Sequence, residues 1–68
     1  MNRDMTKTQF DRRVAELGFR RELMGYYRLP EPYSNISVCA LNAGNRYRDR
    51  LAYLLKYVER EEQKAGAQ

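Results

Sequence analysis

The chain lacks the residues for an internal disulfide or a histidine-containing metal site. This absence limits the folds open to it more than any other feature of its sequence. Its 68 residues include one cysteine, Cys39, and no histidine, so neither an internal disulfide nor a histidine-containing zinc site can hold the fold. A chain of this length buries only about 60% of the surface that its unfolded state exposes, which leaves a free energy of unfolding of about 3–5 kcal/mol. The sequence therefore predicts one small domain with one hydrophobic core.

The missing histidines also bear on catalysis. Without an imidazole, no serine, cysteine or metal centre has its usual general base. The nine acidic residues are scattered beside basic ones, which predicts solvated ion pairs rather than a buried carboxylate pair. Cys39 stands between Val38 and Ala40 in an apolar stretch, where a small buried side chain is expected. We therefore expect a protein without enzymatic activity, cofactor or metal.

Arginine dominates the charge. The net charge is +4, and ten of the 13 basic residues are arginine. Guanidinium groups bind carboxylates and phosphates with two parallel hydrogen bonds, so the excess favours an acidic protein surface or nucleic acid as partner. A GC-rich genome would raise the arginine content in the same way without any functional meaning. No apolar run approaches the roughly 20 residues of a membrane span, and no apolar signal-peptide core is present, so we expect a cytoplasmic protein without a membrane partner.

The first predicted element is a short amphipathic helix from about Lys7 to Leu17. Thr6 and Gln9 have the spacing of a capping box, and residues 1–5 before it are expected to be disordered. Gly18 can take the left-handed conformation that ends a helix, with Phe19 folding back on Val14.

The middle of the chain favours strands. Residues 20–29 are rich in tyrosine and read as extended chain, in which Gly25 is either a bulge or the turn of a tight hairpin. Residues 29–35 contain two prolines and predict a loop. A strand over 36–41 and a turn over 42–44 follow.

The last predicted element is a helix over about residues 46–62, capped by Asn45, with a frayed tail over 63–68. The predicted fold is α+β in the order α-β-β-(β)-α: one domain over residues 6–62, with both helices on one face of a small antiparallel sheet. The core is expected to consist of Phe10, Val14, Leu17, Phe19, Leu51, Leu54, Leu55 and Val58.

The start of the last helix is the first candidate binding site. Arg46, Arg48 and Arg50 crowd a helix end whose dipole disfavours cations, so helix stability does not explain them. Together with the free backbone amides they favour an anion, either a phosphate or an acidic side chain. The other interpretation is that Asp49 and nearby acids neutralise a solvated surface.

Two further candidate surfaces carry tyrosine and arginine, the residues enriched at binding hot spots. One is a line along the last helix, and its tyrosines could instead cover the edge of the core. The other is the sheet face that carries Tyr26 and Arg28 beside Met24 and Cys39. It predicts a homodimer or another partner, or else a face that is simply hydrated. The line along the helix consists of Arg46, Arg50, Tyr53, Tyr57 and Arg60.

The layout resembles double-stranded RNA-binding domains, which place a glycine and a basic cluster at the start of their second helix, as Gly44 and the three arginines do here. From Gln9 to Val58 it also resembles the HicA-type RNA-targeting toxins, through Gly18-Phe19 and through Gly25 before the next strand. Those toxins carry a catalytic histidine just after that second glycine. Here the position holds Tyr26, so nuclease activity is not implied.

The chain also resembles short uncharacterised phage and prophage proteins, in particular through the ending NAG-NRYRDRLAYLLK. Many such proteins inhibit host machinery, anti-CRISPR proteins among them. The leading hypothesis is thus a non-catalytic protein that docks on a bacterial host protein or nucleoprotein complex, such as a CRISPR effector, and inhibits or regulates it. The alternatives are a nucleic-acid binder that contacts RNA or DNA phosphates through Arg46, Arg48 and Arg50, and an inactive relative of a toxin nuclease.

Overall fold

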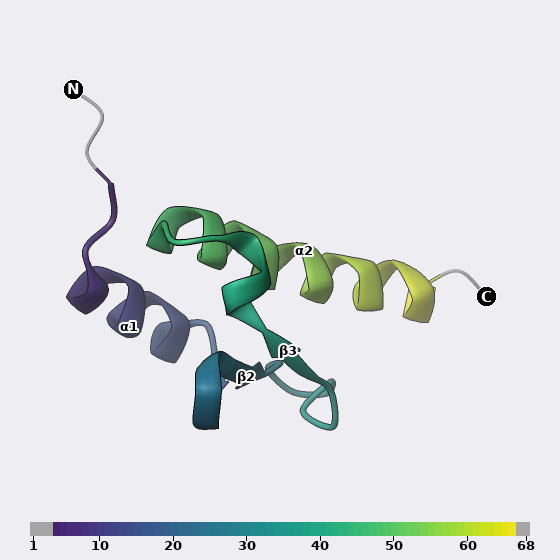
Figure 1. Ribbon diagram of the computed structural model, residues 1–68. Coiled ribbons are helices and arrows are strands. Elements are labelled where there is room, and N and C mark those ends of the chain that lie inside the picture. Colours follow the sequence, from purple (N-terminus) through teal and green to yellow (C-terminus); the bar gives the residue numbers. More distant parts are fainter. Residues whose placement is uncertain (1–3, 67–68) are drawn as a thin grey trace.

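The computed structural model describes residues 4–66 and confirms an α+β fold (Figure 1). Two helices flank a three-stranded antiparallel sheet, and two short 3-10 turns, η1 and η2, connect the pieces. In chain order the elements are α1 (Lys7–Glu16), β1 (Arg20–Arg21), η1 (Leu23–Gly25), β2 (Tyr26–Arg28), β3 (Ser37–Cys39), η2 (Ala40–Ala43) and α2 (Tyr47–Gly66).

Both ends of α1 form as the sequence predicts. The Thr6 hydroxyl accepts from the Gln9 amide at 3.1 Å, and the Gln9 side chain accepts from the Thr6 amide at 3.0 Å, which completes the capping box. At the other end Gly18 has a φ of 94°. The Phe19 amide donates to the Val14 carbonyl at 2.9 Å, so the chain turns back and delivers Phe19 to the core.

Gly25 belongs to a hairpin loop, which decides between the two predicted roles. β1 and β2 pair around η1, and the Glu22 amide donates to the Tyr26 carbonyl at 2.7 Å. Met24 and Gly25 have φ values of 59° and 80°. Consecutive positive φ values match the twist of paired strands, but only the second of these two residues is a glycine.

The register of the sheet decides which side chains face the helices. The strands lie in the order β1-β2-β3, with Tyr27 opposite both Arg21 and Val38. Residues directly opposite each other share a face. Tyr27 and Val38 are buried under the helices, so Arg21 lies on the helix side as well, at the open edge. Tyr26 and Arg28 lie on the outer face, as predicted.

The core joins both helices to one face of the sheet. Phe10 of α1 packs edge-on against Tyr27 with ring centroids 5.7 Å apart, and against Tyr47 of α2 at 5.3 Å. Leu17 and Val58 are partly buried, but Leu55 is 39% exposed, so its predicted core position is wrong. α2 packs mainly against η2 and α1, and Leu54 rather than Leu55 lies on its buried side. The buried residues are Phe10, Val14, Phe19, Tyr27, Leu29, Val38, Ala40, Leu51 and Leu54.

Several boundaries differ from the predicted ones. The strand predicted over 36–41 is β3, and it ends at Cys39 because residues 40–43 turn into η2. The carbonyl of Arg46 accepts the first bond of α2, from the Arg50 amide, so Arg46 and not Asn45 stands at the N-cap. α2 continues to Gly66, so residues 63–66 are helical rather than a frayed tail. Met5 packs against the core although residues 1–5 were expected to be disordered; residues 1–3 and 67–68 lie outside the described part.

Candidate functional site

The three arginines at the start of α2 have different surroundings. Arg46 and Arg48 are exposed, but Arg50 is half-buried and bonded within the protein. Its Nε donates to the Gly44 carbonyl at 2.8 Å, and its guanidinium lies 5.1 Å from the centroid of the Tyr47 ring. Arg50 therefore fastens the loop before α2 to the helix, a role that the sequence did not reveal.

The line of residues predicted along α2 is continuous in its second half. The rings of Tyr53 and Tyr57 are 5.1 Å apart, and their hydroxyls are 3.4 Å apart. The hydrogen bond to Tyr53 raises the pKa of Tyr57. The Arg60 guanidinium lies 5.6 Å from the centroid of the Tyr57 ring. Both tyrosines are half-buried against the core, so they cover its edge and expose the rest of their rings. We call Tyr53, Tyr57 and Arg60 the α2 row.

Helical spacing separates Arg46 from Arg48. Residues two apart do not face each other on a helix, whereas residues seven or eleven apart fall on nearly the same side. Arg46 is the N-cap residue, seven and eleven positions before Tyr53 and Tyr57, so its backbone lies at the end of their side of α2. Arg48 lies on the side of the exposed Leu55. The predicted cluster of three arginines is thus divided among three environments.

The outer sheet face holds an ion-pair network. Arg28 donates from Nε to Glu22 at 2.5 Å and from a terminal nitrogen to the Ser34 carbonyl at 2.9 Å. Ser37 donates to the other Glu22 oxygen at 2.5 Å. The Ser37 hydrogen bond, followed by Arg28, lowers the pKa of Glu22 below its ordinary value. Arg28 thus has internal partners, whereas Tyr26 is 45% exposed. A homodimer through this face stays a prediction.

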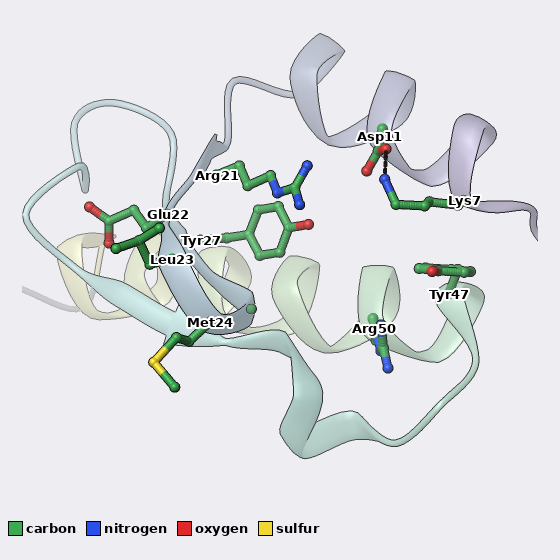
Figure 2. Close-up of a pocket in the computed structure, with 10 residues that line it drawn as sticks. Lys7, Asp11, Arg21, Glu22, Leu23, Met24, Tyr27, Tyr47 and Arg50 are labelled. Carbon is green, nitrogen blue, oxygen red and sulfur yellow. Dashed lines mark hydrogen bonds and ion pairs between the residues drawn. The ribbon is translucent and has the colours of Figure 1, made fainter.

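A cleft that the sequence reasoning missed opens between the starts of both helices and the hairpin. It encloses about 540 Å³. Figure 2 shows the Arg21 guanidinium and the Tyr27 hydroxyl pointing into the same space, with Glu22 turned away. Of the predicted site residues only Arg50 lies here. The charged and aromatic lining consists of Lys7, Asp11, Arg21, Glu22, Tyr27, Tyr47 and Arg50, with Leu23 and Met24 at the rim. The Glu22 carboxylate is bonded to Arg28 and Ser37 on the outer face.

The Tyr27 hydroxyl lies among the charges of this cleft. Burial, and then the negative charge of Asp11, raise the pKa of Tyr27; the positive charges of Arg21, Lys7 and Arg50 oppose that rise. Lys7 is paired with Asp11 at 2.7 Å, and this is the one ion pair between the residues drawn in Figure 2. The hairpin was the feature of the sequence that could have revealed this cleft. With Gly25 in its loop, Arg21 lies opposite the buried Tyr27.

Within residues 4–66, no group of three or more acidic or cysteine side chains is arranged to hold a metal ion. In the same part of the chain, no helix has the length and apolar content to cross a membrane.

Comparison of the chain with protein-family models, with curated proteins and with solved structures finds no match. The resemblances noted in the sequence stay expectations.

Proposed function

We propose that this chain is a small, non-catalytic binding protein that docks on an acidic surface of a larger partner. In line with its resemblance to phage proteins, the proposed partner is a bacterial host protein or nucleoprotein complex that is inhibited or regulated by the contact. One observation carries the proposal: the backbone of exposed Arg46 lies at the end of the side of α2 that also presents the α2 row.

The energetics of Arg46 support a role in binding. A cation at a helix N-terminus opposes the helix dipole, at a cost of about 0.3–1 kcal/mol at an exposed site. Arg50 recovers such a cost through its contacts with Gly44 and Tyr47. Arg46 takes part in none of the side-chain hydrogen bonds or ion pairs of residues 4–66. An anionic partner would supply the missing interaction.

The α2 row supplies a suitable anchor beside that charge. A tyrosine whose ring is already half fixed by the core loses little conformational freedom when a partner covers it. Tyr53 and Tyr57 hold each other edge to face, and Arg60 extends the row by a further positive charge. Tyrosine and arginine side chains at the centre of an interface contribute most of its binding free energy.

Paired charge reversals test the proposal. The double variant Arg46→Glu/Arg60→Glu changes the proposed surface, and Arg12→Glu/Arg48→Glu changes the net charge equally at exposed positions elsewhere. Each protein would be immobilised and exposed to a bacterial extract, with and without nuclease, and bound proteins would be identified and re-tested after purification. We expect the first variant to lose the partner and the control to keep it.

Nuclease treatment and a measurement of affinity against salt concentration distinguish a protein partner from a nucleic-acid partner. Phosphate contacts would make the affinity fall steeply with salt and would make capture sensitive to nuclease. Tyr57→Ala would weaken a protein interface as strongly as the arginine changes. Equal capture by both double variants would contradict the proposed surface.

A further inference from the structure

We propose that the cleft between α1, α2 and η1 binds a segment of a partner chain that carries an acidic residue and an apolar one, with the carboxylate on Arg21 and the apolar side chain on the hairpin tip. The hairpin tip means Leu23 and Met24. The inference deepens the proposed function, because it adds a peptide-binding site to a docking protein. The cleft is a surface separate from the α2 row.

The positive charge of the cleft is not balanced internally. Lys7 and Asp11 neutralise each other at 2.7 Å. The Arg21 guanidinium has no partner among the residues drawn in Figure 2, although it points into the cleft. Arg50 uses only Nε for the Gly44 carbonyl, which leaves the terminal nitrogens of its guanidinium as donors. The free guanidinium of Arg21 matches a carboxylate, and Arg50 adds a second positive charge to the lining.

The placement of Arg21 points to a ligand rather than to stability. Its position opposite Tyr27 puts it on the helix side of the sheet, where a core residue would normally stand. The neighbouring Arg20 has the same charge and the same strand, but it lies on the outer face opposite Arg28. Only one of the two arginines can therefore act in the cleft.

Tyr27 adds a neutral donor at the floor of the cleft. Its residue is 7% exposed, and its hydroxyl points into the cleft (Figure 2). Because its pKa is raised from an ordinary value of 10.0, the phenol keeps its proton at neutral pH. A carboxylate held by Arg21 can accept this further hydrogen bond.

The hairpin tip gives the site its apolar half. Leu23 and Met24 are 85% and 84% exposed, the two most exposed large apolar residues among those described. Met24 also has a left-handed φ of 59°, a strained conformation for a side chain of its size. In an extended peptide, side chains on one face repeat about every 6.6 Å. An acidic residue in the cleft can thus be followed by an apolar residue against the tip.

The same features disfavour a phosphate ligand. The Lys7–Asp11 pair adds no net positive charge to the cleft, and a dianion needs more positive charge than a single carboxylate. An apolar rim also has no partner on inorganic phosphate. A nucleotide is therefore an outcome that would overturn the inference.

The test is a nuclear magnetic resonance titration of the isotope-labelled full chain with a capped hexapeptide that has one aspartate and one leucine two positions apart and serine elsewhere, so that both side chains face the protein in an extended conformation. We expect saturable shifts of backbone amides from Arg21 to Tyr27 and around Arg50. Matched peptides with asparagine for aspartate, or with alanine for leucine, should bind at least several-fold more weakly. This method detects millimolar affinities, so the absence of saturable shifts would refute the inference.

Matched protein variants locate the contact. Arg21→Gln should weaken peptide binding about tenfold, the effect of losing one charged hydrogen bond. Arg20→Gln, the same change on the outer face, should leave binding unchanged. Met24→Asn should weaken binding of the leucine peptide but not of the alanine peptide. Equal losses for the two arginine variants would overturn the inference, because the attraction would then be a general effect of charge.

Two further outcomes separate this inference from the proposed function. The Arg46→Glu/Arg60→Glu variant should bind the hexapeptide as the parent does, because the α2 row is not part of the cleft. If that variant loses its partner while the hexapeptide fails to bind the parent, the proposed function stands and the cleft inference fails. Tighter binding of adenosine monophosphate than of the hexapeptide would also overturn it, since the cleft would then prefer phosphate.

Discussion

Met24 in the hairpin loop allows a direct test of backbone strain in this fold. Met24 holds a φ of 59° with a side chain that is 84% exposed. A left-handed conformation costs a residue with a large side chain about 1–2 kcal/mol, and asparagine tolerates it much better. The buried remainder of the methionine is a sixth of a side chain whose full burial is worth about 1.5–3 kcal/mol, so removing it costs about 0.2–0.5 kcal/mol. Met24→Asn should therefore stabilise the protein by about 0.5–1 kcal/mol.

Thermal and urea unfolding followed by circular dichroism would measure this gain. For a domain of this size, 1 kcal/mol corresponds to a rise of about 4–8 °C in the midpoint temperature. Leu23→Asn is the matched control, because Leu23 is equally exposed but has no positive φ. An unchanged or lowered midpoint for Met24→Asn, or an equal rise for Leu23→Asn, would show that backbone strain at Met24 is not what the substitution relieves.

Three further predictions concern the core, the outer face and the start of α2. Leu54→Ala should cost about 2–5 kcal/mol, comparable to the whole stability, whereas Leu55→Ala should cost far less; urea midpoints would show this. The lowered pKa of Glu22 means that its stabilisation is present above the ordinary value of 4.5 and is lost as the pH falls through the lowered value, so Glu22→Gln should flatten stability between neutral and acidic pH. Arg50→Ala should cost about 1 kcal/mol and Arg48→Ala less than about 0.5 kcal/mol in the same assay; equal effects would contradict the structural role of Arg50.

Local signals in the sequence predicted much of the fold. The capping box at Thr6 and the left-handed Gly18 depend on neighbouring residues alone, and both form as expected. The alternation around Tyr27 likewise fixed the faces of β2. The exposure of Leu55 could not be predicted this way, because it depends on which side of α2 the distant elements η2 and α1 pack against.

The candidate site was harder to predict, because it depends on contacts between distant segments. The three arginines at the start of α2 look equivalent in the sequence, yet only Arg50 meets the Gly44 carbonyl and the Tyr47 ring. Arg21 looked like one of many exposed arginines until the register placed it beside Tyr27. The cleft could not be predicted while Gly25 was either a bulge or a hairpin turn, because only the hairpin puts Arg21 opposite Tyr27.

β1, one of the two edge strands of the sheet, has a consequence for how copies of this protein behave toward one another. An edge strand exposes unpaired backbone groups that invite a second sheet to join, and short length and inward-pointing charge are two ways in which proteins prevent this. β1 has only two residues, both arginine, one on each face. Pairing of two such edges would bring four guanidinium groups together without counter-charges. Concentrated solutions of the protein are therefore protected from sheet-to-sheet aggregation at this edge, and removing the charge of Arg21 would weaken that protection as well as the cleft.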